Sequence, residues 1–98
     1  MLVRIVKMEF EKEHIEDFQA LFSAVRNKII NFDGCQSVEL YQDIDTENRF
    51  FTYSHWDYTE ALEKYRSSSF FKETWARTKV LFSNKPEAWS VQQSKLLS

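Results

Sequence analysis

The stretch NRFFTYSHWDYTEALEKYRSSSFF, residues 48–71, holds the features that decide the fold. Its ring-rich first part, residues 49–56, predicts a β-strand. Asp57, with Glu60 three residues later, has the pattern of a capping box, which predicts the start of a short helix. The serine run at residues 67–69 interrupts that helix and predicts a cap for a second one. We therefore expect a strand followed by a helical region in two parts.

The residues before this stretch predict a strand and a long helix. Residues 2–10 carry apolar side chains on both faces, as in a strand covered on both sides. From residue 13 the apolar positions follow a 3-4-3-4-3 spacing, which predicts an amphipathic helix of about five turns. Gly34 is expected to end this helix, because a residue without Cβ adopts the left-handed conformation cheaply. The stripe consists of Ile15, Phe18, Phe22, Val25, Ile29 and Phe32.

The remaining segments predict two strands and a helix. Residues 36–42 alternate and read as a strand, and the DIDTEN turn at residues 43–48 joins them to the next strand as a hairpin. The second part of the split helix is expected over about residues 69–83, and residues 84–86 break it. Trp89 and Val91 then alternate in a last strand.

The resulting order is β-α-β-β-α-β over a chain of 98 residues. That length is one domain, residues 1–98, and no repeat or linker divides it. The simplest architecture is an α+β, ferredoxin-like domain with an antiparallel sheet. Two helices would cover one face of the sheet and leave the other bare. If the bare face carries rings, a second copy of the chain must cover it, which predicts a homodimer with two-fold symmetry.

Composition and charge exclude several classes of function. The chain has one glycine, so phosphate-binding loops of the Walker and dinucleotide types are excluded. Its 13 basic and 15 acidic side chains give a net charge of −2, without the basic surplus that nucleic-acid binding needs. We expect no nucleic-acid partner and, because no apolar run approaches about 18 residues, no membrane partner.

The cysteine and histidine residues give no sign of a metal site. His14, His55 and Cys35 lie far apart and form no pair with the spacing of metal ligands, so no metal is expected. A single cysteine favours a reducing compartment. The start MLVRIVKMEF lacks the apolar core of a signal peptide. The cytoplasm is therefore the expected location.

The opening stretch also resembles the signature of the antibiotic-biosynthesis monooxygenase-like (ABM) family of dimeric α/β barrels. The family resemblance implies a homodimer in which two sheets pack into a barrel, with a pocket between each sheet and its helices. Members of this family include cofactor-free oxygenases that act on polycyclic or quinol-type aromatics, and haem-degrading enzymes. The residues that carry the resemblance are Tyr53, Trp56, Asp57, Ala61, Leu62, Ser68 and Phe71.

The haem-degrading branch of that family is a poorer match. The resemblance places Lys7, Tyr65 and Trp75 where that branch has an asparagine, a tryptophan and a haem-ligating histidine. An indole cannot ligate iron, so haem degradation by that mechanism is disfavoured and no cofactor is expected.

A cluster of rings is the candidate binding site for a flat aromatic molecule, because ring faces and edges hold such ligands well. The alternative is that these rings belong to the core or to a dimer interface. Arg66 and Arg77 could reach an anionic substituent of a ligand. The candidate substrate-binding residues are Tyr53, Trp56, Tyr65, Phe71, Trp75 and Phe22.

His55 and Tyr65 are the candidates for proton transfer. His55 and Trp56 occupy neighbouring strand positions and cannot both line one cavity, since successive side chains point to opposite faces. The first hypothesis is a cofactor-independent monooxygenase for a small aromatic or quinol-like molecule. The alternative is a non-enzymatic dimeric module that binds an apolar metabolite. RNA binding by strand aromatics is a weaker third reading, disfavoured by the negative net charge.

Overall fold

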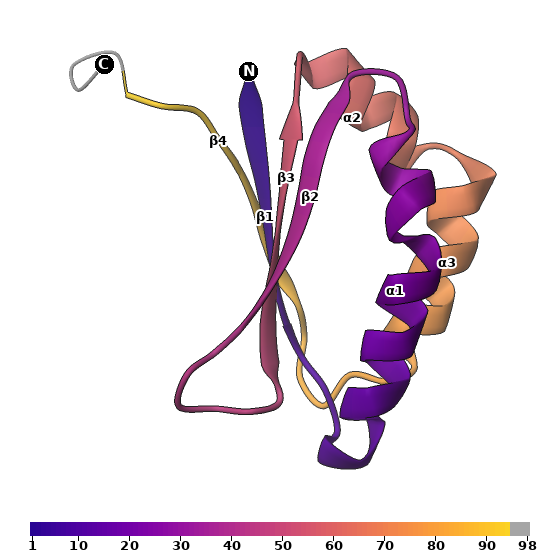
Figure 1. Cartoon of the computed structure of the whole chain (residues 1–98), viewed down its shortest axis with the longest axis vertical. Coiled ribbons are helices and arrows are strands. Elements are labelled where there is room, and N and C mark those ends of the chain that lie inside the picture. Colours follow the sequence, from indigo (N-terminus) through magenta and orange to yellow (C-terminus); the bar gives the residue numbers. More distant parts are fainter. Residues whose placement is uncertain (95–98) are drawn as a thin grey trace.

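The computed structural model describes residues 1–94 and shows a four-stranded sheet with helices packed on one side (Figure 1). A short 3-10 helix leads directly into the longest helix of the described residues. The elements are β1 (Leu2–Glu9), η1 (Lys12–His14), α1 (Ile15–Ile30), β2 (Cys35–Gln42), β3 (Arg49–Trp56), α2 (Thr59–Arg66), α3 (Ser69–Lys79) and β4 (Glu87–Val91).

The strands lie in the order β2-β3-β1-β4, and every neighbouring pair is antiparallel. The predicted α+β, ferredoxin-like fold with the order β-α-β-β-α-β is therefore confirmed, with the second helical region split into α2 and α3. β1 lies between β3 and β4, so that Val6 has Thr52 on one side and Ala88 on the other. This arrangement places side chains from three strands beside one another under the helices.

The core lies between the sheet and α1, and it is built from rings. Phe10 and Phe18 stack with ring centroids 4.1 Å apart, and Phe50 meets Phe18 edge-on at 5.3 Å. Met8 from β1 and Phe22 from α1 are also buried in this cluster. The apolar stripe predicted for the long helix is thus the face that packs on the sheet.

The opposite face of the sheet carries apolar side chains and no covering element among residues 1–94 (Figure 1). Phe50 is buried beneath the helices, so its neighbour Phe51 points to the other face. Tyr53 lies on that face too, where its ring meets Tyr41 at 5.3 Å. Trp89 on β4 is 44% exposed. We refer to this surface as the open face.

Two details of the helix ends differ from the sequence predictions. α1 ends at Ile30 with Asn31 as its C-cap, so Gly34 lies beyond the helix, in the turn before β2. Asp57 does not cap α2; Tyr58 occupies the N-cap position without a side-chain hydrogen bond. The Asp57 carboxylate instead accepts hydrogen bonds from Gln36 Nε2 at 2.9 and 3.0 Å. A tertiary partner across the sheet end therefore replaces the local cap.

The last helix is also shorter than predicted, since α3 ends at Lys79. The following residues turn back and form an isolated bridge between Phe82 and Phe10. Of the helices in residues 1–94, α1 is the longest with 16 residues, and none is long and apolar enough to cross a membrane.

Candidate functional site

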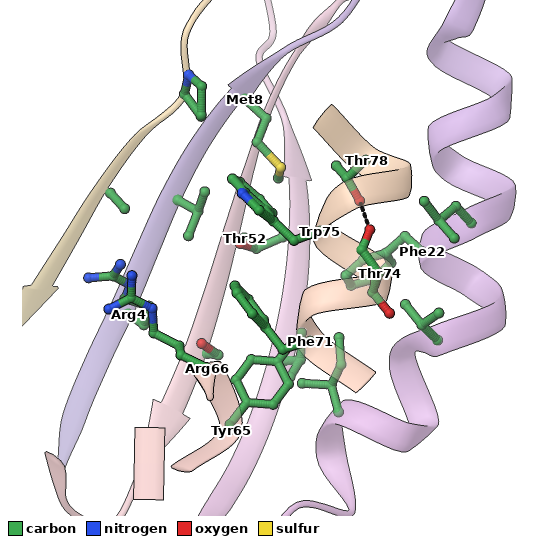
Figure 2. Close-up of a pocket in the computed structure, with 18 of the residues that line it drawn as sticks. Arg4, Met8, Phe22, Thr52, Tyr65, Arg66, Phe71, Thr74, Trp75 and Thr78 are labelled. Carbon is green, nitrogen blue, oxygen red and sulfur yellow. Dashed lines mark hydrogen bonds between the residues drawn. The ribbon is translucent and has the colours of Figure 1, made fainter. Parts of the chain in front are cut away.

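A cavity of about 400 Å³ lies between the sheet and the helices (Figure 2). All four strands provide one wall, and helices α1, α2 and α3 provide the other. Its volume is within the range of sites that hold a small organic molecule.

Three rings from α2 and α3 form the helical wall of the cavity: Tyr65, Phe71 and Trp75 (Figure 2). Tyr65 meets Phe71 edge-on at 5.0 Å, and Phe71 stacks parallel to Trp75 at 6.0 Å with an interplanar angle of 9°. Phe71 and Trp75 are one helical turn apart, which places both on the same side of α3. The result is a pair of parallel rings against which a planar ligand can pack.

Ser68 sets the angle at which the two short helices meet. Its hydroxyl donates to the Tyr65 carbonyl at 2.6 Å, and its Oγ accepts from the Phe71 N–H at 3.1 Å as the N-cap of α3. One side chain thus links the end of α2 to the start of α3. This link places Tyr65 beside Phe71, and it confirms that the serine run caps the second helix.

Tyr65 contributes a phenol hydroxyl to the ring wall. Burial, with a contribution from Cys35, raises the pKa of its phenol above the ordinary value. Its hydroxyl has no hydrogen-bond partner among residues 1–94. A phenol of raised pKa stays protonated at neutral pH, so Tyr65 can donate a hydrogen bond to a ligand but cannot serve as a base.

The strand wall adds polar groups that the sequence reasoning missed. Thr52 and Ser54 line the cavity from β3, and Ser54 Oγ accepts a hydrogen bond from Trp56 Nε1 at 2.9 Å. Arg4 enters from β1. The signal in the sequence was the two-residue alternation, since Thr52 and Ser54 share a face with Trp56.

Of the predicted substrate-binding residues, the structure brings together Phe22, Tyr65, Phe71 and Trp75 around the cavity. Trp56 is fully buried behind this wall and stacks on Tyr65 at 5.1 Å. It supports the ring that faces the cavity, without facing the cavity itself.

Tyr53 and His55 do not line the cavity, because both lie on the open face of β3. His55 Nδ1 is 2.9 Å from Ser37 Oγ of the neighbouring strand β2. The sheet separates His55 from the cavity, so the imidazole has no direct path to a ligand bound there. Within residues 1–94, no three or more His, Cys, Asp or Glu side chains converge as a metal site.

The sequence matches the family described as antibiotic biosynthesis monooxygenase over residues 1–77, which is most of the chain. This chain belongs to the ABM family. The match includes the sheet strands β1 to β3 and the helices that carry Phe22, Tyr65, Phe71 and Trp75. The resemblance seen in residues 48–71 is thereby confirmed.

Solved structures show the same ABM fold. Rv0793 from Mycobacterium tuberculosis is 18% identical, with 96% of this chain and 95% of that chain covered and a TM-score of 0.87. A conserved protein from Methanosarcina mazei Go1 is also 18% identical, with 96% and 94% covered and a TM-score of 0.89. A protein named as an antibiotic biosynthesis monooxygenase is 16% identical, with 96% and 99% covered and a TM-score of 0.88. No curated protein matches this ABM chain.

Proposed function

We propose that this ABM protein is a cofactor-independent monooxygenase that oxidises a small aromatic or quinol-like molecule in the cavity. The observation that carries the proposal is the cavity itself, with the parallel rings of Phe71 and Trp75 in its wall and the Tyr65 phenol beside Phe71. Family membership supports the type of reaction. Phe22 completes the apolar lining from α1.

In this reaction the substrate itself supplies the electrons that reduce O₂. One oxygen atom enters the product, and the other leaves as water together with two hydrogens of the substrate. The apolar walls remove water from the electron-rich ring and hold it beside O₂. The Tyr65 phenol, which is kept protonated, donates a hydrogen bond to the substrate oxygen as negative charge develops on it.

Incubation with a panel of dihydroxyaromatics tests the reaction. We expect one or more members to give an oxygenated product and to consume O₂ in equal amount, at rates above those without protein. Labelled ¹⁸O₂ should place one labelled atom in the product and one in water. Identical products with and without O₂ would contradict the proposal.

Tyr65→Phe tests the role of the phenol. Loss of one hydrogen-bond donor to a developing oxyanion should lower kcat by about 100-fold while KM changes little. Tyr58→Phe is the matched control, because Tyr58 is 48% exposed and lies outside the cavity lining. An unchanged kcat in Tyr65→Phe would remove this residue from the mechanism.

One observation favours the alternative of a non-enzymatic module that binds an apolar metabolite. Among the described residues that line the cavity, Glu87 is the one that carries a carboxylate, but its side chain lies on the open face, where it pairs with Lys7 Nζ at 3.3 Å, and does not point into the cavity. His55 lies on the other face of the sheet. A binding module predicts that His55→Phe and Tyr65→Phe leave ligand affinity nearly unchanged and that no panel member consumes O₂.

We also propose that two copies of the chain associate through their open faces as a homodimeric barrel. Val3, Ile5, Phe51, Tyr53 and Trp89 give this face a contiguous apolar character. Exposed apolar patches of this kind mark interaction sites, and a two-fold axis allows the same patch to cover its own copy. The ABM family membership supports this assembly.

Sedimentation of the whole chain tests the assembly. The wild-type protein should sediment as a dimer at micromolar concentration, and Trp89→Glu should shift it towards the monomer. Trp89 is exposed in the single chain, so the far-UV circular dichroism should stay the same. The matched control is Ile44→Glu, since Ile44 is 98% exposed in the turn between β2 and β3. A monomeric wild type, or a dimeric Trp89→Glu, would contradict the proposal.

A further inference from the structure

Two arginines meet at one end of the cavity. Arg4 extends from β1 on the face under the helices, and Arg66 is the last residue of α2. Figure 2 shows their guanidinium groups side by side, away from Trp75 and Thr78. Arg66 is exposed at the edge of the cavity, whereas Arg4 is half-buried. The cavity therefore has an apolar, ring-walled body and one positively charged end.

These two charges have no acidic partner among residues 1–94. Arg4 Nη1 donates to Ser90 Oγ at 3.1 Å, and the ion pairs of the described residues include neither Arg4 nor Arg66. The Glu87 carboxylate lies on the open face, where it pairs with Lys7 Nζ at 3.3 Å. Burial and the charge of Arg66 both lower the pKa of Arg4. Two like charges held together are unfavourable until an anion joins them.

We propose that the cavity binds an aromatic carboxylate, with its ring on Phe71 and Trp75 and its carboxylate between Arg4 and Arg66. A guanidinium presents two parallel N–H donors that match the two oxygens of a planar carboxylate. The parallel rings of Phe71 and Trp75, with centroids 6.0 Å apart, supply an aromatic contact for the rest of the ligand. This inference uses the cavity of the proposed function and narrows its ligand to molecules that carry an acidic group at one end.

Calorimetric titration of the full chain with 2-naphthoate and 2-naphthamide tests the proposal. The two probes have nearly the same shape and differ in charge. We expect 2-naphthoate to bind at least tenfold more tightly at low salt, and the difference to shrink as salt screens the charges. Equal affinity for the two probes, or binding of neither, would overturn the proposal.

Variants assign the preference to the arginine pair. Arg66→Gln and Arg4→Gln should each weaken 2-naphthoate binding by about tenfold and leave 2-naphthamide binding unchanged. Arg66→Lys should prefer 2-naphthoate more strongly than Arg66→Gln does but less strongly than the wild type does. Lysine keeps the positive charge and lacks the two parallel N–H donors of the guanidinium. Arg77→Gln is the matched control, since Arg77 is exposed on α3 and lies outside the cavity lining. A preference that survives Arg66→Gln, or is lost in Arg77→Gln, would overturn the assignment.

The failure of the carboxylate site can be distinguished from the failure of the proposed monooxygenase. Arg66 is exposed, so its replacement decides the question even if Arg4→Gln does not fold. Binding is measured without turnover, so selective binding of 2-naphthoate without any O₂ consumption would support the carboxylate site and contradict the monooxygenase. Oxygenation of neutral substrates, together with equal affinity for 2-naphthoate and 2-naphthamide, would support the monooxygenase and contradict the carboxylate site.

Discussion

Gly34 shows how one residue can serve two purposes. Its φ of +85° lies in the left-handed region, where a side chain is strained. A Cβ at this position would lie 2.5 Å from Ala61 Cβ of α2, which is closer than two carbon atoms that are not bonded to each other can approach. The turn before β2 therefore needs glycine both for its backbone conformation and for its contact with α2.

We predict that Gly34→Ala lowers the free energy of unfolding by about 2–4 kcal/mol, because it adds backbone strain to a steric clash. Urea unfolding measures this loss. Gly34→Ala combined with Ala61→Gly should recover part of it, since the second change removes the clashing methyl. A single variant as stable as the wild type would contradict the assigned role.

Glu9 gives the stability a dependence on pH. Its carboxylate accepts from Arg49 Nε at 2.6 Å and from Asn84 Nδ2 at 2.6 Å. The hydrogen bond from Arg49, followed by that from Asn84, lowers the pKa of Glu9 below its ordinary value. A lowered pKa in the folded state means that Glu9 contributes stability above its unfolded pKa, and that this contribution is lost as pH falls through the folded value.

We predict that Arg49→Met destabilises the protein at pH 7 and that the difference from wild type shrinks as pH falls below about 4, the ordinary range for a glutamate. Asn84→Ala should give a smaller effect of the same sign. Chemical unfolding at several pH values between about 3 and 7 measures both. A difference between Arg49→Met and wild type that stays constant with pH would show that Glu9 ionisation is not involved.

At the scale of elements, the joint between α2 and α3 depends on one of three consecutive serines. Ser68 Oγ binds both the Tyr65 carbonyl and the Phe71 N–H. We predict that Ser68→Ala lowers the free energy of unfolding by about 1 kcal/mol, through loss of the N-cap of α3. It should also weaken binding of aromatic ligands, because the cap places Tyr65 beside Phe71.

Ser67→Ala is the control for this change. Ser67 is the exposed C-cap residue of α2, and no side-chain hydrogen bond of Ser67 occurs within the described part of the chain. It should change the stability by less than about 0.5 kcal/mol. Thermal and urea unfolding compare the two variants, and equal losses would contradict the specific role of Ser68.

The periodicity of apolar residues was enough to predict α1 and β2, because a period of 3.6 or 2 reports which face of an element is buried. The prediction of β3 came from its ring-rich composition, and that of α2 and α3 from the capping pattern and the serine run. Element ends were less accurate where a tertiary contact competes with a local one. Asp57 had the sequence of a helix cap, yet its carboxylate accepts from Gln36, 21 residues earlier. A capping pattern in the sequence cannot show that a side chain from another strand will donate hydrogen bonds to the same carboxylate.

At the scale of the whole molecule, the ring cluster under α1 holds the sheet and helices together. Phe50 is 1% exposed and contacts the rings of Phe10 and Phe18 at 5.8 and 5.3 Å. We predict that Phe50→Ala lowers the free energy of unfolding by about 3–5 kcal/mol, which is a large part of the about 5–15 kcal/mol typical of a small domain.

Ile44→Ala provides the comparison for this loss, because Ile44 is an apolar residue that is 98% exposed. It should change the stability by less than about 0.5 kcal/mol. Equilibrium unfolding in urea measures both variants. A similar small effect at Phe50 would mean that the ring cluster does not carry the stability of the fold.

The sequence by itself determined the order of elements, the ferredoxin-like fold and the ABM resemblance, because these depend on local periodicity and on a contiguous stretch. Tertiary structure alone decided which face of each strand lies under the helices. Phe50 and Phe51 are both apolar neighbours, so alternation could not show that Phe50 is in the core and Phe51 on the open face. The face of β3 that lies under the helices excludes Tyr53 and His55 from the cavity. The face of β1 that lies under the helices places Arg4 beside Arg66, 62 residues later in the chain.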